Sequence, residues 1–198
     1  NNGDLTFSDT STSWGLDPPS FSNGAAFSDL DNDGDLDYIV NNINDEAFIF
    51  KNRSEKLNKN NFVQIDLIGP EKNITGIGAK VVIRYSNDKF QYHENYHTRG
   101  YMSAVDNTIH FGLGKNNQIK FVEILWPDGN YQKIKNVTLN KKFKVFYKNS
   151  SFIDIHSLDF PLVKNKSKTL LKEVSNEKKL NYTHKQIDKF DFNIQRLI

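Results

Sequence analysis

The sequence contains no cysteine among its 198 residues. It can therefore have neither a disulfide framework nor a metal site built from thiolates. No apolar run approaches the roughly 18 residues that a membrane-spanning helix requires, so we expect no direct membrane insertion by this segment. The chain also starts without an initiator methionine or a signal peptide. We therefore expect it to be part of a longer protein.

Basic residues are missing from the first quarter of the chain. Residues 1–50 contain ten Asp and Glu residues and no Lys or Arg, whereas all 26 basic residues lie from Lys51 onward. This asymmetry predicts two modules, the first of which needs a cation. We expect no nucleic-acid partner for the second module. Only four of its basic residues are Arg, and its Lys residues alternate along expected strands, as on a solvated face.

The strongest chemical signal is the acidic stretch DLDNDGDLD at residues 29–37. Calcium prefers six to eight oxygen ligands, which a tight loop of carboxylates and one backbone carbonyl supplies. Without a cation, each close pair of these carboxylates costs up to about 4 kcal/mol. Gly34 permits the sharp turn that folds the loop around one ion. We predict that Asp35 binds Ca²⁺ through its backbone carbonyl and that four aspartates bind it through their side chains: Asp29, Asp31, Asp33 and Asp37.

The acidic stretch differs from an EF-hand loop. An EF-hand needs a bidentate Glu at position 12 of the loop, and Val40 stands there. The flanking residues 25–27 and 38–40 are short apolar segments without the pattern of amphipathic helices. The sequence therefore predicts a calcium site between two strands.

The N-terminal residues NGAAFSDLDNDGDLDYIVNN resemble the FG-GAP/VCBS repeat, and the preceding NNGDLTFSD resembles the opening strand of the same repeat. The resemblance covers residues 1–52. It implies a four-stranded propeller blade whose D-x-D-x-D-G-x-x-D loop binds calcium. One blade cannot bury both of its faces alone, so neighbouring blades of the parent chain are expected partners.

From residue 62 onward, apolar and polar residues alternate in six segments, which predicts an antiparallel β-sandwich or barrel-like domain. The sequence Trp126-Pro127-Asp128-Gly129 predicts a type I turn between two of its strands. We interpret Trp126 as a core aromatic residue. We interpret His110, in an alternating strand, as a hydrogen-bonded structural histidine.

Residues 62–147 resemble the ASPIC/UnbV domain, which follows such repeats in cartilage acidic protein and in many bacterial surface proteins. Four motifs carry the resemblance, in order: NITGIGAKV at 73–81, RGYMS at 99–103, HFGLG at 110–114 and ILWPDG at 124–129. The resemblance implies no catalytic residues.

The chain is thus predicted to be all-β, with four parts. These are a propeller-blade-type repeat at 1–52, a linker at 53–61, the ASPIC/UnbV-like domain at 62–150, and a linker with the start of a further repeat at 151–198. The expected function is non-catalytic: a calcium-binding module of an exported bacterial protein. We expect it outside the cell or at the outer-membrane surface, recognising a polysaccharide or a protein.

The alternative function is a hydrolase, with an active site elsewhere in the parent chain or a zinc site in the stretch HENYH at 93–97. This stretch matches the H-E-x-x-H signature of zinc peptidases, with His93 and His97 as ligands and Glu94 as general base. On a helix the two histidines would lie about 6 Å apart and share one ion. On a strand they would lie roughly 13 Å apart. The alternating pattern here predicts a strand, which argues against zinc.

Overall fold

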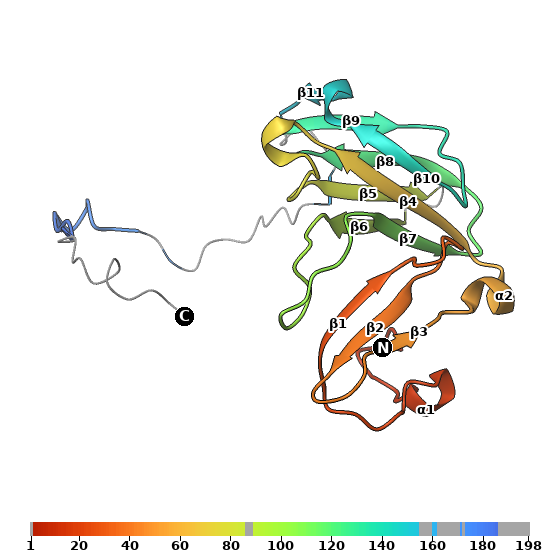
Figure 1. Ribbon diagram of the computed structural model, residues 1–198. Coiled ribbons are helices and arrows are strands. Elements are labelled where there is room, and N and C mark those ends of the chain that lie inside the picture. Colours follow the sequence, from red (N-terminus) through yellow and green to blue (C-terminus); the bar gives the residue numbers. More distant parts are fainter. Residues whose placement is uncertain (1, 86–88, 155–159, 162–170, 172, 186–198) are drawn as a thin grey trace. The chain divides into compact units, whose positions relative to one another are not determined.

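The computed structural model describes residues 2–85, 89–154, 160–161, 171 and 173–185 (Figure 1). The chain divides into two units, Asn1–Pro161 and Leu162–Ile198. The structure is mostly β, which confirms the all-β prediction, and its described residues form no closed barrel. In the second unit, residues 175–179 form turns. The further repeat expected at 151–198 falls largely on residues outside the described ranges.

The N-terminal sheet has three antiparallel strands in the order β1-β2-β3. Its strands are β1 (Ser22–Ser28), β2 (Asp37–Asn42) and β3 (Phe48–Phe50), with the short helices α1 (Ser11–Trp14) before them and α2 (Ser54–Asn58) after them. Helix α2 lies within the segment expected to be a linker. The sheet supplies three of the four strands that the blade resemblance implies.

The prediction of an opening strand within NNGDLTFSD was wrong, because residues 2–9 form no strand. No strand lies among residues 2–21, and Leu5 and Phe7 are exposed. Two aspartates bend the backbone here, because each accepts a hydrogen bond from the N–H two residues later: Thr6 to Asp4 at 3.0 Å and Ser11 to Asp9 at 2.9 Å. Such side-chain bonds compete with strand pairing.

The second part of the first unit contains two sheets that pack face to face (Figure 1). One has the order β10-β4-β7 and the other the order β11-β9-β8-β5-β6. The bounds are β4 (Asn61–Ile68), β5 (Lys80–Tyr85), β6 (Phe90–Glu94), β7 (Ile109–Gly114), β8 (Ile119–Leu125), β9 (Asn130–Ile134), β10 (Lys142–Phe146) and β11 (Ser151–Phe152), with 3₁₀ turns η1 (Glu71–Asn73) and η2 (Tyr147–Asn149). The expected antiparallel arrangement fails at one pair, because β10 runs parallel to β4.

The core lies between these two sheets and is built from alternate residues of their strands. Val63 and Ile65 of β4 face Val81 and Ile83 of β5 across it, and all four are fully buried. Burial of each such side chain stabilises the fold by about 1.5–3 kcal/mol. This alternation is the pattern that the sequence predicts.

The predicted turn and core tryptophan are both present. The N–H of Gly129 bonds the carbonyl of Trp126 at 3.0 Å, closing the turn. Trp126 is 2% exposed, and its ring meets that of Tyr147 edge-on at 5.3 Å. The prediction that Trp126 is a core residue is confirmed.

Candidate metal centre

The acidic loop joins β1 to β2 and folds back on itself. Ser28 pairs with Asp37 at its base, and two residues within it have positive φ angles, Asn32 at 59° and Gly34 at 97°. A Cβ atom on Gly34 would lie 1.9 Å from the ring of Phe62. Glycine is therefore required here both by backbone conformation and by the close approach of β4.

Asp29, the first loop aspartate, holds the turn together. Its carboxylate accepts hydrogen bonds from the N–H groups of Asp33 and Gly34, each at 3.1 Å. It also accepts one from the side-chain amide of Gln64, in β4, at 2.7 Å. His110 lies in β7, in the same sheet as Gln64. Its Nε2 lies 2.9 Å from the carbonyl oxygen of Gly34. The prediction that His110 is a hydrogen-bonded structural histidine is confirmed.

Asp37, the last loop aspartate, binds two backbone N–H groups. It is 3% exposed, and its two oxygens accept hydrogen bonds from the N–H of Leu30 at 3.1 Å and of Asn52 at 2.8 Å. No cluster of three potential metal ligands among the described residues includes it. The structure therefore gives this predicted ligand a role in holding the loop to the end of β3.

The remaining aspartates form two overlapping clusters of carboxylates. In each cluster, the potential ligand atoms all lie within 4.8 Å of one another. One cluster is Asp29, Asp31 and Asp33, and the other is Asp33, Asp35 and Glu55. Asp33 is shared by both, so a cation beside it is within reach of carboxylates from the loop and from helix α2.

Asp35 has the most distinctive environment of the loop. It is 9% exposed, and its Oδ2 accepts hydrogen bonds from Ser54 Oγ at 2.9 Å and from the N–H of Glu55 at 3.1 Å. Its Oδ1 is buried and has no hydrogen-bond partner, and the same is true of Oε2 of Glu55. A buried carboxylate oxygen without a donor is costly unless a cation compensates it. The sequence prediction gave Asp35 only a backbone role, whereas its side chain points into the second cluster.

Glu55 was missed by the sequence prediction. It lies in the polar segment assigned to the linker, 20 residues after Asp35. The only local signal is its place in the first turn of α2, where acidic residues are common. Its approach to Asp33 depends on how α2 returns to the loop.

Lys51 supplies the positive charge at the outer side of the site. Its ammonium group pairs with Asp31, and it lies 3.9 Å from Asp33. The hydrogen bond from Lys51 lowers the pKa of Asp31. The pKa of Asp33 is raised, because burial disfavours its charged form and because Asp35 and Asp31 repel it. Ionised Asp33 is thus poorly compensated by the protein alone.

The HENYH stretch forms no comparable cluster. His93 lies in β6, as the sequence predicts, and Glu94 ends that strand. His97 lies beyond the strand, and its Nε2 is buried without a partner. Among the residues that the structure describes, both clusters of three potential ligands are wholly acidic. The two histidines are not brought together with a third ligand.

A comparison with known protein families finds a match in the middle of the chain. Residues 69–152 match the family described as ASPIC and UnbV, which confirms the ASPIC/UnbV resemblance, with bounds slightly shifted from 62–147. This domain is associated with surface or extracellular proteins. No curated protein matches the chain. In the part of the chain with described coordinates, no helix is both long and apolar enough to span a bilayer.

Proposed function

We propose that residues 1–58 bind calcium through the acidic loop and helix α2, as a non-catalytic FG-GAP/VCBS-type blade attached to the ASPIC/UnbV domain. The ion is held by the side chains of Asp33, Asp35 and Glu55, and Asp31 belongs with Asp29 and Asp33 to the overlapping cluster. Asp29 and Asp37 keep the loop folded around it. This assignment keeps the predicted loop and adds a glutamate from outside it.

The observation that carries the proposal is the pair of buried, unpartnered carboxylate oxygens, Oδ1 of Asp35 and Oε2 of Glu55. Asp35 and Glu55 both belong to the cluster that contains Asp33. A hard divalent cation with oxygen ligands relieves all three carboxylates at once. The raised pKa of Asp33 agrees with a site that lacks its positive charge.

The wider function we propose is recognition of a polysaccharide or protein surface by an exported bacterial protein. The association of the ASPIC/UnbV domain with surface or extracellular proteins supports this. Extracellular calcium modules commonly have dissociation constants of about 10⁻⁴–10⁻³ M, which suits the concentrations outside cells. Calcium then stabilises the fold, and recognition belongs to other surfaces.

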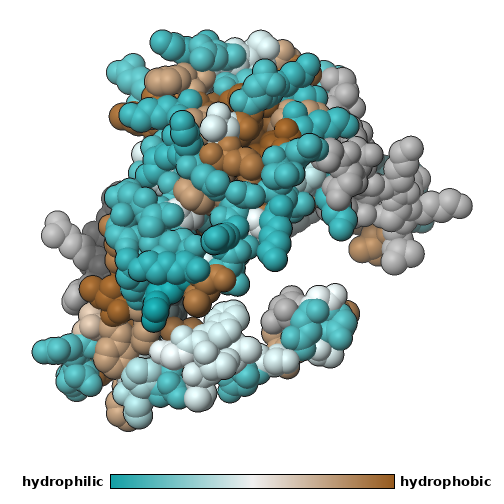
Figure 2. Space-filling model, turned by 90° about the vertical axis from the view of Figure 1, so that its right-hand side faces the viewer, coloured by the Kyte–Doolittle hydropathy of each residue, from teal (hydrophilic) through white to brown (hydrophobic). Residues whose placement is uncertain are grey.

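Neighbouring blades of the parent protein are the expected partners of the N-terminal sheet. Figure 2 shows hydrophobic side chains at the surface of the face that it draws. In the N-terminal part of the chain, the exposed hydrophobic residues include Phe7 at 79%, Phe21 at 81% and Ile49 at 68% exposure. Large exposed apolar patches mark surfaces that another element covers.

The test is thermal unfolding in 10 mM calcium and in EDTA. For dissociation constants in the extracellular range, calcium should raise the Tm by about 3–10 °C. Magnesium at the same concentration should have a smaller effect, because it requires a tighter octahedral site. Asp33→Asn should remove the calcium-dependent shift, while Asp17→Asn, an exposed acidic position outside the loop, should retain it. Equal Tm values for the wild type in calcium and in EDTA would sink the assignment.

A further inference from the structure

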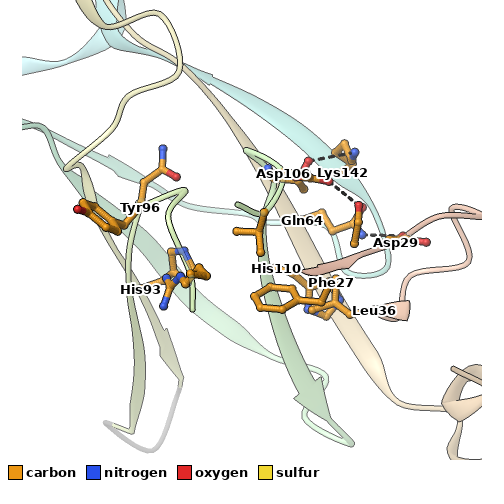
Figure 3. Close-up of a pocket in the computed structure, with 14 residues that line it drawn as sticks. Phe27, Asp29, Leu36, Gln64, His93, Tyr96, Asp106, His110 and Lys142 are labelled. Atoms are coloured by element: carbon orange, nitrogen blue, oxygen red, sulfur yellow. Dashed lines mark hydrogen bonds between the residues drawn. The ribbon is translucent and has the colours of Figure 1, made fainter. Parts of the chain in front are cut away.

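A pocket of about 280 Å³ lies between the N-terminal sheet and the ASPIC/UnbV domain (Figure 3). Phe27 and Leu36 line it from the N-terminal side, and His93 and Arg99 line it from the domain side. Figure 3 shows His93 on one side of the pocket and Phe27 with Leu36 on the other. The volume is just below the usual range for small-molecule sites, about 300–1,000 Å³. It suits one ring-sized ligand.

Two hydrogen bonds join the sides of the pocket. Ser28, at the end of β1, donates to the carboxylate of Asp106 at 2.7 Å. The N–H of Ala25 donates to the hydroxyl of Ser103 at 3.0 Å. Ser103 belongs to the RGYMS motif, so this motif contacts the edge of the N-terminal sheet. These two hydrogen bonds therefore hold the N-terminal sheet against the domain beside the pocket.

His93 is a half-buried polar group whose ring nitrogens are unused. Its ring packs edge-on against Phe111 at 6.1 Å, and it has no hydrogen bond to any described residue. Burial, with a smaller effect of the Arg99 charge, lowers the pKa of His93. The imidazole is therefore neutral at pH 7 and presents one donor and one acceptor nitrogen.

Arg99 is a second group of the lining with free hydrogen-bonding capacity, and it is a donor. Arg99 makes one long hydrogen bond, at 3.4 Å, to the carbonyl of Glu94, and it has no salt bridge to a described carboxylate. The two acidic residues of the lining are already occupied. Asp29 accepts from the loop and from Gln64, and Asp106 accepts from Ser28 and Thr108. The groups of the lining that remain free to bind a ligand thus include the guanidinium of Arg99, the neutral imidazole of His93 and the apolar side chains of Phe27 and Leu36.

We propose that this pocket binds a sugar ring that carries a carboxylate, a hexuronate unit of an extracellular polysaccharide. Arg99 pairs with the carboxylate. His93 bonds a ring hydroxyl, which both donates and accepts, and Phe27 covers an apolar face of the ring. An acidic peptide side chain would satisfy Arg99 but offers no hydroxyl to His93. This inference rests on the proposed recognition function and names its site and ligand class.

The test measures binding of a trigalacturonate to the full chain in calcium by titration calorimetry. The comparison ligands are the neutral galactose trimer and a tri-glutamate peptide. The uronate should bind at least about tenfold more tightly than the neutral trimer, since it alone forms the charge-assisted bond. Arg99→Ala and His93→Ala should each weaken uronate binding about tenfold or more. Arg53→Ala, an exposed arginine outside the pocket, should leave it unchanged.

The same variants separate this proposal from the calcium proposal. Arg99 is exposed, so Arg99→Ala should keep the calcium-dependent Tm shift and lose only the uronate. A wild-type protein that shows the calcium shift but binds no uronate overturns the pocket assignment alone. Equal binding of the neutral trimer, or preferred binding of the peptide, also overturns it. Uronate binding without a calcium shift supports the pocket and contradicts the metal site.

Discussion

The side-chain amide of Gln64, in β4, donates a 2.7 Å hydrogen bond to the carboxylate of Asp29, the first residue of the acidic loop. Gln64 is 4% exposed, and the bond is partly buried. It links the sandwich domain to the loop at the point where the loop leaves β1. The shape of the loop therefore depends on a residue 35 positions away in the sequence.

Gln64→Ala should destabilise the protein with and without calcium. The substitution leaves a carboxylate oxygen of Asp29 short of a donor and opens space in β4, which we expect to cost about 1–3 kcal/mol. Chemical denaturation in EDTA measures this loss. Calcium affinity should fall as well, because the loop loses part of its support. Gln118→Ala, at an exposed glutamine, is the matched control, and an equal loss there would refute a specific role for the Gln64 bond.

Gly34→Ala should be more harmful than Gly15→Ala. Both glycines have positive φ angles, 97° and 73°, so both substitutions carry backbone strain of about 1 kcal/mol or more. Only at Gly34 would the new methyl group also collide with a side chain, that of Phe62. The difference in Tm between the two variants isolates this collision. Similar Tm values would mean that Phe62 moves aside without loss.

Lys51→Met should raise the affinity for calcium. The ammonium group of Lys51 pairs with Asp31 and lies near Asp33 in the absence of an ion, so a cation that enters the site must displace it. Exposed pairs of this kind are weak, and we expect an increase of about two- to fivefold. Titration calorimetry measures the change, with Lys115→Met as a control at an exposed lysine outside the site. A lower affinity in Lys51→Met would show that Lys51 supports the site.

Asp33→Asn should have opposite effects on stability in EDTA and in calcium. The pKa of Asp33 is raised in the folded chain, because of burial and of repulsion by Asp35 and Asp31, above the value of about 3.9 for an unfolded aspartate. Asp33 therefore makes its full contribution to the free energy of unfolding below about pH 3.9. This contribution is lost as the pH rises through the pKa of the folded chain. At pH 7 without calcium, the neutral Asn should raise the Tm by about 1–3 °C.

With calcium bound, the order of the two proteins should reverse, because ionised Asp33 is then a ligand. Melting curves at pH 4, 5, 6 and 7 in both buffers follow the crossover. In calcium, the advantage of the wild type should shrink as the pH falls, since protons compete with the ion. If Asp33→Asn lowered the Tm equally in both buffers at pH 7, the residue would have a structural role only.

Most strands of the sandwich could be predicted from the sequence, because their periodicity is local. A strand buried on one face repeats every two residues, and β4, β5, β7 and β8 follow that repeat closely. The opening strand expected within NNGDLTFSD is absent for a reason that is also local. Asp4 and Asp9 accept hydrogen bonds from the backbone and so favour turns over a strand. Such bonds are weak individually, so a short apolar pattern in the sequence does not show whether the turn or the strand forms.

By itself, the sequence determined the all-β class, the acidic turn around Gly34, the ASPIC/UnbV segment and the strand at His93. The fold class, the turn and the strand depend on neighbouring residues, so composition and spacing are sufficient for them, whereas the ASPIC/UnbV segment was expected from its resemblance to that family. The tertiary structure alone decided which side chains meet. It brings Glu55 to Asp33, uses Asp37 as a loop support, and opens a pocket beside His93. These outcomes depend on strand register and on the path of α2, which are set by packing between distant segments.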